Sequence, residues 1–257
     1  MSENMKDKRV GEINYNNFGS KMIIIKYNNN NDIWVEFQDS YKAKVHSRYN
    51  QFIKGKIANP YDKTVYNIGY LGENYKYNKI IYDEWFQMLQ RCYDPYYLNK
   101  RPTYRDCTVC EEWHNFSNFT KWYEENYYEI LNEKMCLDDK DILIKGNKIY
   151  SPQTCIFTPQ RINLLFVKRD FCRGEFPIGC DCHKNSNKIR VRCNTIEDNK
   201  IKRKCLGYFP INKPFQAFTC YKNFKENYIK QVADKYRDLI PIELYNTMYK
   251  YEVEIND

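Results

Sequence analysis

The chain has 257 residues, a formal net charge of +8 and an aromatic content of 17%. Its mean hydropathy is −0.82, and no apolar run approaches the roughly 18 residues of a membrane-spanning helix, which excludes an integral membrane protein. The first ten residues, MSENMKDKRV, include no apolar segment of the kind that directs secretion. We therefore expect a cytoplasmic protein whose eleven cysteines are reduced.

Residues 11 to 75 predict a small β unit. The runs KMIIIKY (21–27) and DIWVEF (32–37) are rich in β-branched and aromatic residues, and the four asparagines between them are typical of a hairpin turn. A third strand is expected in YKAKVHS (41–47). Short strands this close together favour a small barrel-like unit or an open meander. Such units bind many kinds of partner, so the predicted fold alone indicates no function.

Residues 78 to 134 are expected to be mainly helical. In NKIIYDEWFQMLQRCYD (78–94) apolar side chains recur every three or four residues, and CEEWHNFSNFTKWYEENYYEIL (110–131) has a second, aromatic stripe at that spacing. Stripes of this kind usually belong to a hydrophobic core. Between residues 111 and 141 nine acidic side chains oppose three lysines, so this region is unsuited to a polyanion.

Residues 135 to 167 contain the stretch LDDKDILIKGNKIYSPQTCIFTPQRIN (137–163). A short apolar segment ends in carboxylates and is followed by a Gly-Asn turn. A second apolar segment then leads into a helix that begins near Pro159. The pattern predicts strand, loop, strand and helix, which together make a ββα unit with acidic and amide side chains at its joints.

Residues 174 to 257 predict a three-stranded antiparallel sheet backed by a helix. The strands are expected in FPIGCDCHK (176–184), KIRVRCN (188–194) and KCLGYF (204–209), and the helix begins near Pro214, where proline suits the first turn. Apolar and basic residues alternate in KIRVRC. This alternation places the apolar set under the helix and the basic set on the open face of the sheet.

Basic residues are concentrated in this region, where eleven of them oppose five acidic residues between 168 and 205. A basic sheet face suits the major groove of DNA, where arginine pairs with guanine edges and lysine contacts phosphates. The alternatives are an AT-rich genome, which explains the overall composition, and a solvated face that binds nothing. The candidate DNA-binding residues are Lys184, Lys188, Arg190, Arg192, Lys202, Arg203, Lys204 and Tyr208.

Several of these features occur in the order found in Apetala2-type DNA-binding domains. They are Gly179, the basic strand at 188–193, LGYF (206–209) and the helical segment FQAFTCYK (215–222). The C-terminal region resembles that family, and the resemblance implies a sheet that reads DNA in the major groove. The family's tryptophan on the reading strands is absent here.

The ββα pattern, together with WFQMLQRC (85–92) and TVCEEWHNFSNFTKW (108–122), resembles the HNH endonucleases of phages and mobile elements, which commonly carry Apetala2-type domains. The resemblance implies a phage or mobile-element protein that acts in a bacterial host cell. Matched to the family's positions, Asp138 and Asp139 lie near its metal-binding aspartate and catalytic histidine. Asn147 lies near its loop asparagine, and Asn163 near its helix ligand. The catalytic histidine itself is replaced, which argues against efficient hydrolysis.

The cofactor depends on whether this core is active. If it is, the resemblance implies Mg²⁺ bound by Asp139 and Asn163, with Asp138, Asp139 and Asn147 as the catalytic residues. Zinc is not expected. Cys107 and Cys110 have zinc-knuckle spacing, but the other set, Cys180, Cys182 and His183, has a different spacing and lies in another predicted module.

The sequence thus predicts an α+β protein in three parts: a β unit at 11–75, a helical region with a ββα core at 78–167, and a sheet with C-terminal helices at 174–257. The function expected first is binding of double-stranded DNA by a protein with an impaired HNH-like core. An active divalent-metal-dependent endonuclease of the homing type is the second hypothesis. A protein-interaction factor, acting through the β unit or the acidic helices, is the third.

Overall fold

A computed structural model describes residues 8–138, 142–167, 175–182, 187–197 and 200–255. The protein is mixed α+β, as the sequence predicts. It divides into two compact units: residues 1–125 with 149–151 form the N-terminal unit, and residues 126–148 with 152–257 form the C-terminal unit. The domain boundaries predicted after residues 75 and 167 fall inside these units. Among the described residues, no helix combines the length and apolar character needed to cross a membrane.

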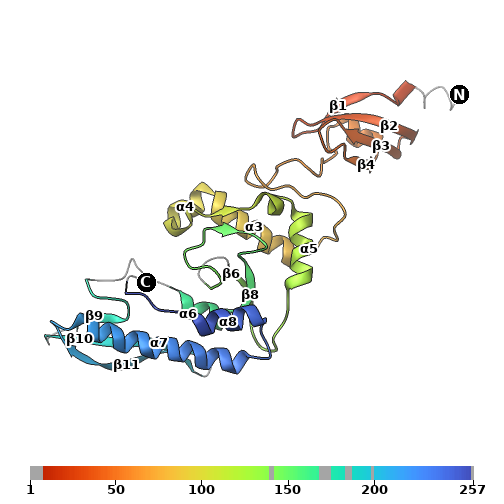
Figure 1. The fold of residues 1–257 in the computed structure, drawn as a ribbon. Coiled ribbons are helices and arrows are strands. Elements are labelled where there is room, and N and C mark those ends of the chain that lie inside the picture. The colour runs from red at the N-terminus through yellow and green to blue at the C-terminus, as the bar shows by residue number, and fades with distance from the viewer. Residues whose placement is uncertain (1–7, 139–141, 168–174, 183–186, 198–199, 256–257) are drawn as a thin grey trace. The chain divides into compact units, whose positions relative to one another are not determined.

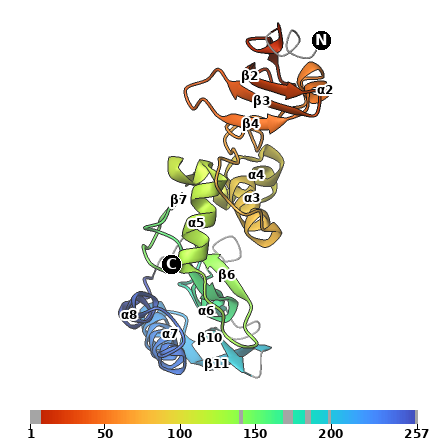
Figure 2. The same ribbon diagram turned by 90° about the vertical axis from the view of Figure 1, so that its right-hand side faces the viewer.

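The N-terminal unit begins with an antiparallel sheet of four strands in the order β1-β2-β3-β4. Figure 2 shows β2, β3 and β4 side by side. The predicted hairpin is formed by β2 and β3, and the third predicted strand is β4. The barrel-like expectation is corrected to the open meander, because β1 spans only three residues and no pairing between β1 and β4 closes the sheet within the described residues. The strands are β1 (Ile13–Tyr15), β2 (Lys21–Asn29), β3 (Asp32–Phe37) and β4 (Lys44–Ser47).

One face of this sheet carries the core of the β region. Alternate residues of β2 and β3 are buried there, because side chains two apart in a strand share a face. Phe52 of the short helix α2 (Tyr49–Ile53) and Ile57 complete the cover. The buried strand residues are Met22, Ile24, Tyr27, Ile33, Val35 and Phe37.

The helical part of the N-terminal unit follows the predicted apolar stripes. Trp85 of α3 is buried, and its indole N–H donates a hydrogen bond to the carbonyl oxygen of Trp113 at 2.7 Å. Phe116 and Phe119 of α5 are also buried. The elements are α3 (Lys79–Tyr93), α4 (Pro95–Lys100), η1 (Pro102–Tyr104), β5 (Thr108–Val109), η2 (Glu111–His114) and α5 (Phe116–Asn126), with β7 (Ile149–Tyr150) parallel to β5.

The C-terminal unit contains the ββα unit and the second predicted sheet (Figure 1). In the ββα unit, β6 (Met135–Asp138) pairs antiparallel with β8 (Ile156–Pro159), and α6 (Gln160–Phe166) follows directly. The predicted three-stranded antiparallel sheet has the order β11-β10-β9. Its strands are β9 (Cys180–Cys182), β10 (Lys188–Glu197) and β11 (Lys200–Pro210), and two helices follow, α7 (Pro214–Tyr236) and α8 (Ile242–Lys250).

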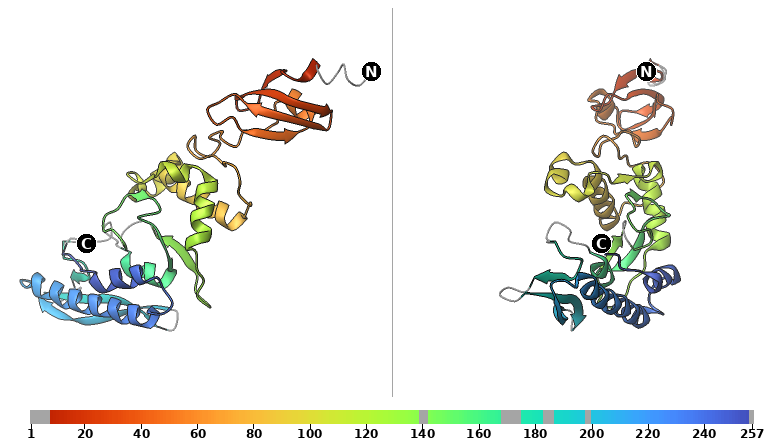
Figure 3. Two further views of the ribbon diagram at one scale, coloured as in Figure 1. Left: turned by 45° about the vertical axis from the view of Figure 1, so that its right-hand side comes forward. Right: turned by 60° about the vertical axis from the view of Figure 1, so that its left-hand side comes forward.

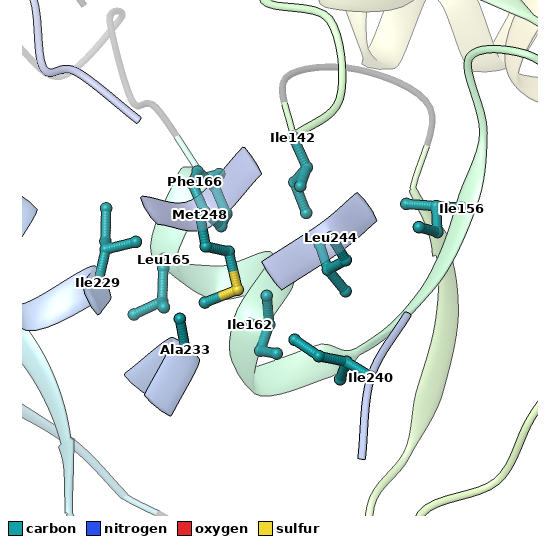
Figure 4. Close-up of a cluster of buried hydrophobic side chains, with 10 residues drawn as sticks. All are labelled: Ile142, Ile156, Ile162, Leu165, Phe166, Ile229, Ala233, Ile240, Leu244 and Met248. Carbon is teal, nitrogen blue, oxygen red and sulfur yellow. The ribbon is translucent and has the colours of Figure 1, made fainter. Parts of the chain in front are cut away.

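Helix α7 connects two hydrophobic cores. Its 23 residues correspond to a length of about 35 Å, and it lies along the sheet and beside α8 (Figure 3). Near its start, Ala217, Phe218 and Tyr221 pack against the sheet. Further along, Ile229 and Ala233 pack with residues of α6 and α8, including Ile162 and Leu244 (Figure 4). The sheet and the ββα unit are therefore parts of one packed body.

Candidate nucleic-acid interface and ββα unit

The central strand of the C-terminal sheet, β10, alternates between two faces as the sequence predicts. Ile189, Val191 and Cys193 are buried against α7. The residues between them point to the opposite face, which α7 does not cover, because successive side chains of a strand alternate. Lys188, Arg190 and Arg192 therefore share one face, which we call the open face.

Pairing with β11 adds further residues to the open face. Side chains directly opposite each other in an antiparallel pair lie on the same face. Arg190 is paired with Tyr208, and Asn194 is paired with Arg203. The Arg203 Nε–H donates to Asn194 Oδ1 at 3.2 Å, and Tyr208 is 52% exposed. Among the described candidates, the structure brings together Lys188, Arg190, Arg192, Arg203 and Tyr208 on this face.

Lys202 and Lys204 do not extend the open face, which corrects the expectation for these two residues. They are paired with Thr195 and Cys193, the buried side of β10, and the Lys204 Nζ lies 5.2 Å from the centre of the Phe224 ring of α7. A β-bulge causes this placement: Val191 is paired with Gly207 but Arg192 with Cys205, so β11 shifts by one residue and its faces exchange. Lys184 lies outside the described residues.

Asp181 of β9 joins the two arginines of β10. The Arg190 guanidinium donates to both carboxylate oxygens, at 3.2 and 2.7 Å, and the Arg192 Nη2 donates to Oδ2 at 2.7 Å. Hydrogen bonding and charge from Arg190 and Arg192 lower the pKa of Asp181, and Asp181 in turn raises the pKa of Arg190. Sequence reasoning does not place Asp181 in the site, because only the pairing of β9 with β10 brings it to Arg190.

The open face can therefore attract and orient a polyanion. Its described residues include four cationic side chains and one carboxylate. The carboxylate, that of Asp181, holds two of the guanidinium groups in fixed orientations. An arginine has five N–H donors in a planar fork, so each retains donors beyond those used by Asp181. Fixed guanidinium groups lose less conformational entropy when they bind a phosphate or the edge of a base.

The ββα unit has the element order predicted for it. Cys136 and Asp138 lie on the same face of β6, two residues apart, and are paired with Thr158 and Ile156 of β8. Asn163 of α6 reaches this face, because its Nδ2 lies 3.3 Å from Cys136 Sγ. The structure therefore places Asp138 and Asn163 on one face of the unit, with Cys136 beside Asn163.

The carboxylate of Asp138 is buried, because the residue is only 7% exposed. Its paired neighbour Ile156 belongs to the core formed with α6 and α8. Thr158, on the same face, is fully buried, and its hydroxyl oxygen has no hydrogen-bond partner among the described residues. Asn147 lies in the loop between β6 and β7, where its N–H donates to Ile144 O at 3.0 Å. Asp139 lies outside the described residues.

These residues fit a divalent cation only in part. Mg²⁺ prefers carboxylate and amide oxygens and retains several waters, and the described part of the unit offers the Asp138 carboxylate and the Asn163 amide oxygen. The amide N–H of Asn163 is already turned to Cys136. No group of three or more histidines, cysteines or acids arranged to hold a metal ion is found among the described residues.

The cysteine pairs considered for zinc lie in different units. Cys107 and Cys110 flank β5 in the N-terminal unit, whereas Cys180 and Cys182 are the ends of β9 in the C-terminal unit. Burial raises the pKa of the Cys110 thiol and that of Cys180, the latter to about 11, which disfavours the thiolate that zinc requires. His183 lies outside the described residues.

Comparison of the chain with protein-family models, with curated proteins and with solved structures gives no match. The case for a function therefore rests on the geometry of the open face and on the resemblance of its motifs.

Proposed function

We propose that the chain binds double-stranded DNA through the open face of the β9–β11 sheet. The observation that carries the proposal is the grouping of Lys188, Arg190, Arg192 and Arg203 on a face that α7 leaves uncovered. Protein that contacts phosphates gains affinity by releasing counterions, and a face with several cations can do so at more than one phosphate.

The shape of the open face supports contact with bases as well as phosphates. The major groove admits a β-sheet edge or ribbon, and an arginine at its floor can pair with both acceptors of a guanine. Asp181 holds the guanidinium groups of both Arg190 and Arg192, and a fixed orientation favours an arginine that reads a base. Tyr208, which is paired with Arg190, is exposed and supplies an aromatic surface beside that arginine.

Fluorescence anisotropy with a mixed-sequence labelled duplex tests this proposal. Arg190→Gln combined with Arg192→Gln is compared with Lys202→Gln combined with Lys204→Gln, which removes the same charge from the other side of the sheet. The arginine variant is expected to lose about 100-fold in affinity, because each arginine contact contributes about 1–3 kcal/mol. The lysine variant is expected to lose less than about fivefold in affinity for the duplex, because it only weakens the long-range electrostatic attraction. Equal losses, or no binding by the parent protein, would contradict the proposal.

A second candidate function is divalent-metal-dependent cleavage of DNA by the ββα unit. The observation that favours it is the placement of Asp138 and Asn163 on one face beside an unpartnered buried hydroxyl, that of Thr158. Asp138, Asp139 and Asn163 would hold the metal, and a bound divalent ion would stabilise charge on the scissile phosphate. The burial of Asp138 and the absence of a histidine at this position make cleavage the weaker candidate.

Plasmid nicking in Mg²⁺ or Mn²⁺ tests the second candidate. Asp138→Asn keeps the shape of the side chain but removes its charge, and Asp238→Asn, which changes an exposed acid of the same unit, is the matched control. Metal-dependent nicking that is lost only in Asp138→Asn would support cleavage. If the parent protein binds duplex but leaves the plasmid intact in both metals, the second candidate is rejected and DNA binding stands. Thermal melting of both variants separates lost chemistry from lost folding.

A further inference from the structure

A cavity of about 440 Å³, partly open to solvent, lies in the C-terminal unit, where the two cores along α7 meet. It is lined by the end of α6, the start of β9, the part of β10 beyond its pairing with β9, one side of α7 and the segment after α8. Its volume falls in the range of sites that enclose small molecules. None of the candidate functions assigns a role to this space.

Lys225 of α7 is the unusual residue of the cavity. It is only 8% exposed and occupies the buried stripe of the helix, four residues after Tyr221 and four before Ile229. Within the described residues its ammonium group has no hydrogen-bond or ion-pair partner. A buried charge is normally paired, because an unpaired one loses its hydration without compensation.

The surroundings of Lys225 combine further cations with apolar surface. Arg192 and Arg203 of the open face also line the cavity, and Asp181 is the acid among the lining residues. Its apolar walls include Leu165, Phe166, Ile196, Tyr221, Tyr251 and Val253. A ligand suited to this space therefore presents apolar surface to these side chains and negative charge to Lys225.

The electrostatics of the site agree with this geometry. Burial lowers the pKa of Lys225, opposed only by the nearby thiol of Cys193. An anion placed against the amine would favour its protonated form and restore the interactions that the ammonium lost on leaving water. A carboxylate or phosphate oxygen of a ligand in the cavity would supply such an anion.

We infer that this cavity binds a small amphipathic anion, with its carboxylate or phosphate group against Lys225 and its apolar body between α6, Tyr221 and Tyr251. The cavity shares Asp181, Arg192 and Arg203 with the open face, but the inference does not rest on DNA binding, because ligand binding to the cavity is measured with no DNA present. It also assigns a role to a lysine that would otherwise be a buried charge without function.

Titration with octanoate and octanol, followed by calorimetry, tests the inference. The two probes share an apolar chain and differ in charge. The parent protein is expected to bind octanoate at least about tenfold more tightly than octanol, because only the carboxylate can pair with the ammonium. Octyl phosphate, a second anion with an eight-carbon chain, is expected to bind as well as octanoate.

Two variants locate the site. Lys225→Met keeps an unbranched side chain of similar length without charge, and it is expected to lose the preference for octanoate over octanol while still binding octanol. Lys235→Met removes an exposed lysine from the same helix and is expected to keep the preference. Failure of the parent protein to bind either anion, equal binding of octanoate and octanol, or an unchanged preference in Lys225→Met would each overturn the inference.

Discussion

In the β9–β11 sheet Arg190, Arg192 and Arg203 lie on the face that α7 leaves uncovered. In the ββα unit, by contrast, Asp138 lies on the face that contains Cys136 and the helix residue Asn163. The two regions thus present their polar groups in opposite ways. Arg190, Arg203 and Tyr208 are accessible to a large partner, but Asp138 lies beside core residue Ile156. The difference teaches that the same alternation of side chains along a strand leaves charged groups accessible where one face of a sheet is uncovered, and buries them where a helix packs on that face.

The largest effect on stability is expected at Gly179, where the sheet region tolerates no side chain. Gly179 has a φ of +77°, and an added Cβ would lie 2.1 Å from Tyr221 Cδ2 of α7. Gly179→Ala is therefore expected to lower the free energy of unfolding by about 3 kcal/mol, through backbone strain and the clash together. Chemical denaturation measures the change.

Gly146, in the loop of the ββα unit, is the matched control. It has the same φ of +77°, but an added Cβ there would meet no atom within 4 Å. Gly146→Ala is expected to cost only the backbone strain, about 1 kcal/mol. If both substitutions lower the free energy of unfolding by the same amount, Tyr221 does not pack closely against Gly179.

A tenfold effect on DNA affinity is expected at Arg203 but not at its neighbour Lys204, because the bulge puts Arg203, and not Lys204, on the open face. Arg203→Gln is expected to weaken duplex binding about tenfold, and Lys204→Gln less than about threefold, because only Arg203 stands on the open face. Anisotropy titrations of the two single variants make the comparison. The reverse order would show that β11 has the register without a bulge.

A smaller effect, of opposite sign, is expected at Asp181. Asp181→Asn removes the one described carboxylate of the open face and keeps a hydrogen-bond acceptor for Arg190. Duplex affinity is expected to rise about threefold at low salt, because the carboxylate no longer repels the DNA phosphates. The gain is expected to be smaller at high salt, which screens that repulsion. A fall in affinity would mean that orientation of the two arginines by the carboxylate matters more than its charge.

A pH-dependent difference is expected at Lys225, between the two cores. Burial lowers the pKa of Lys225 below its ordinary value near 10.5. At a pH between these two values the amine is protonated in the unfolded chain but not in the folded chain, so the free energy of unfolding rises with pH across this window. The groups that share its surroundings are Cys193, Tyr221, Asp181, Arg192, Arg203 and Tyr251. Lys225→Met is expected to have a larger free energy of unfolding than the parent protein at neutral pH, and the difference is expected to shrink as the pH rises toward 10.5. A margin that is constant with pH would contradict a desolvated amine.

The sequence predicts the faces of β10 correctly but not those of β11. Regular alternation in KIRVRC is enough to separate Ile189 and Val191 from Arg190 and Arg192. In β11 three consecutive basic residues, Lys202 to Lys204, cannot share a face, and the bulge opposite Val191 and Arg192 decides which of them face outward. Gly207 beside the bulge is the nearest sequence signal, and it does not specify a register.

Other features depend on contacts between distant parts of the chain. The predicted ββα order is found, but the burial of Asp138 follows from packing of β8, α6 and α8, which no local pattern encodes. The pairing of β7 with β5 is equally non-local. Lys225 could have been noticed, because its spacing of four from Tyr221 and from Ile229 places a lysine in the buried stripe of α7.

Alkylation of two natural cysteines, with and without duplex DNA, tests the central claim most directly. Cys205 and Cys182 are both exposed and not in disulfides, but Cys205 is paired with Arg192 on the open face and Cys182 is paired with Ile189 on the face toward α7. Saturating duplex is expected to slow alkylation of Cys205 by iodoacetamide at least about fivefold and to change that of Cys182 less than about twofold, because bound DNA would cover the open face alone. Protection of Cys182 but not Cys205, or of neither under conditions where duplex is bound, would contradict the proposed interface.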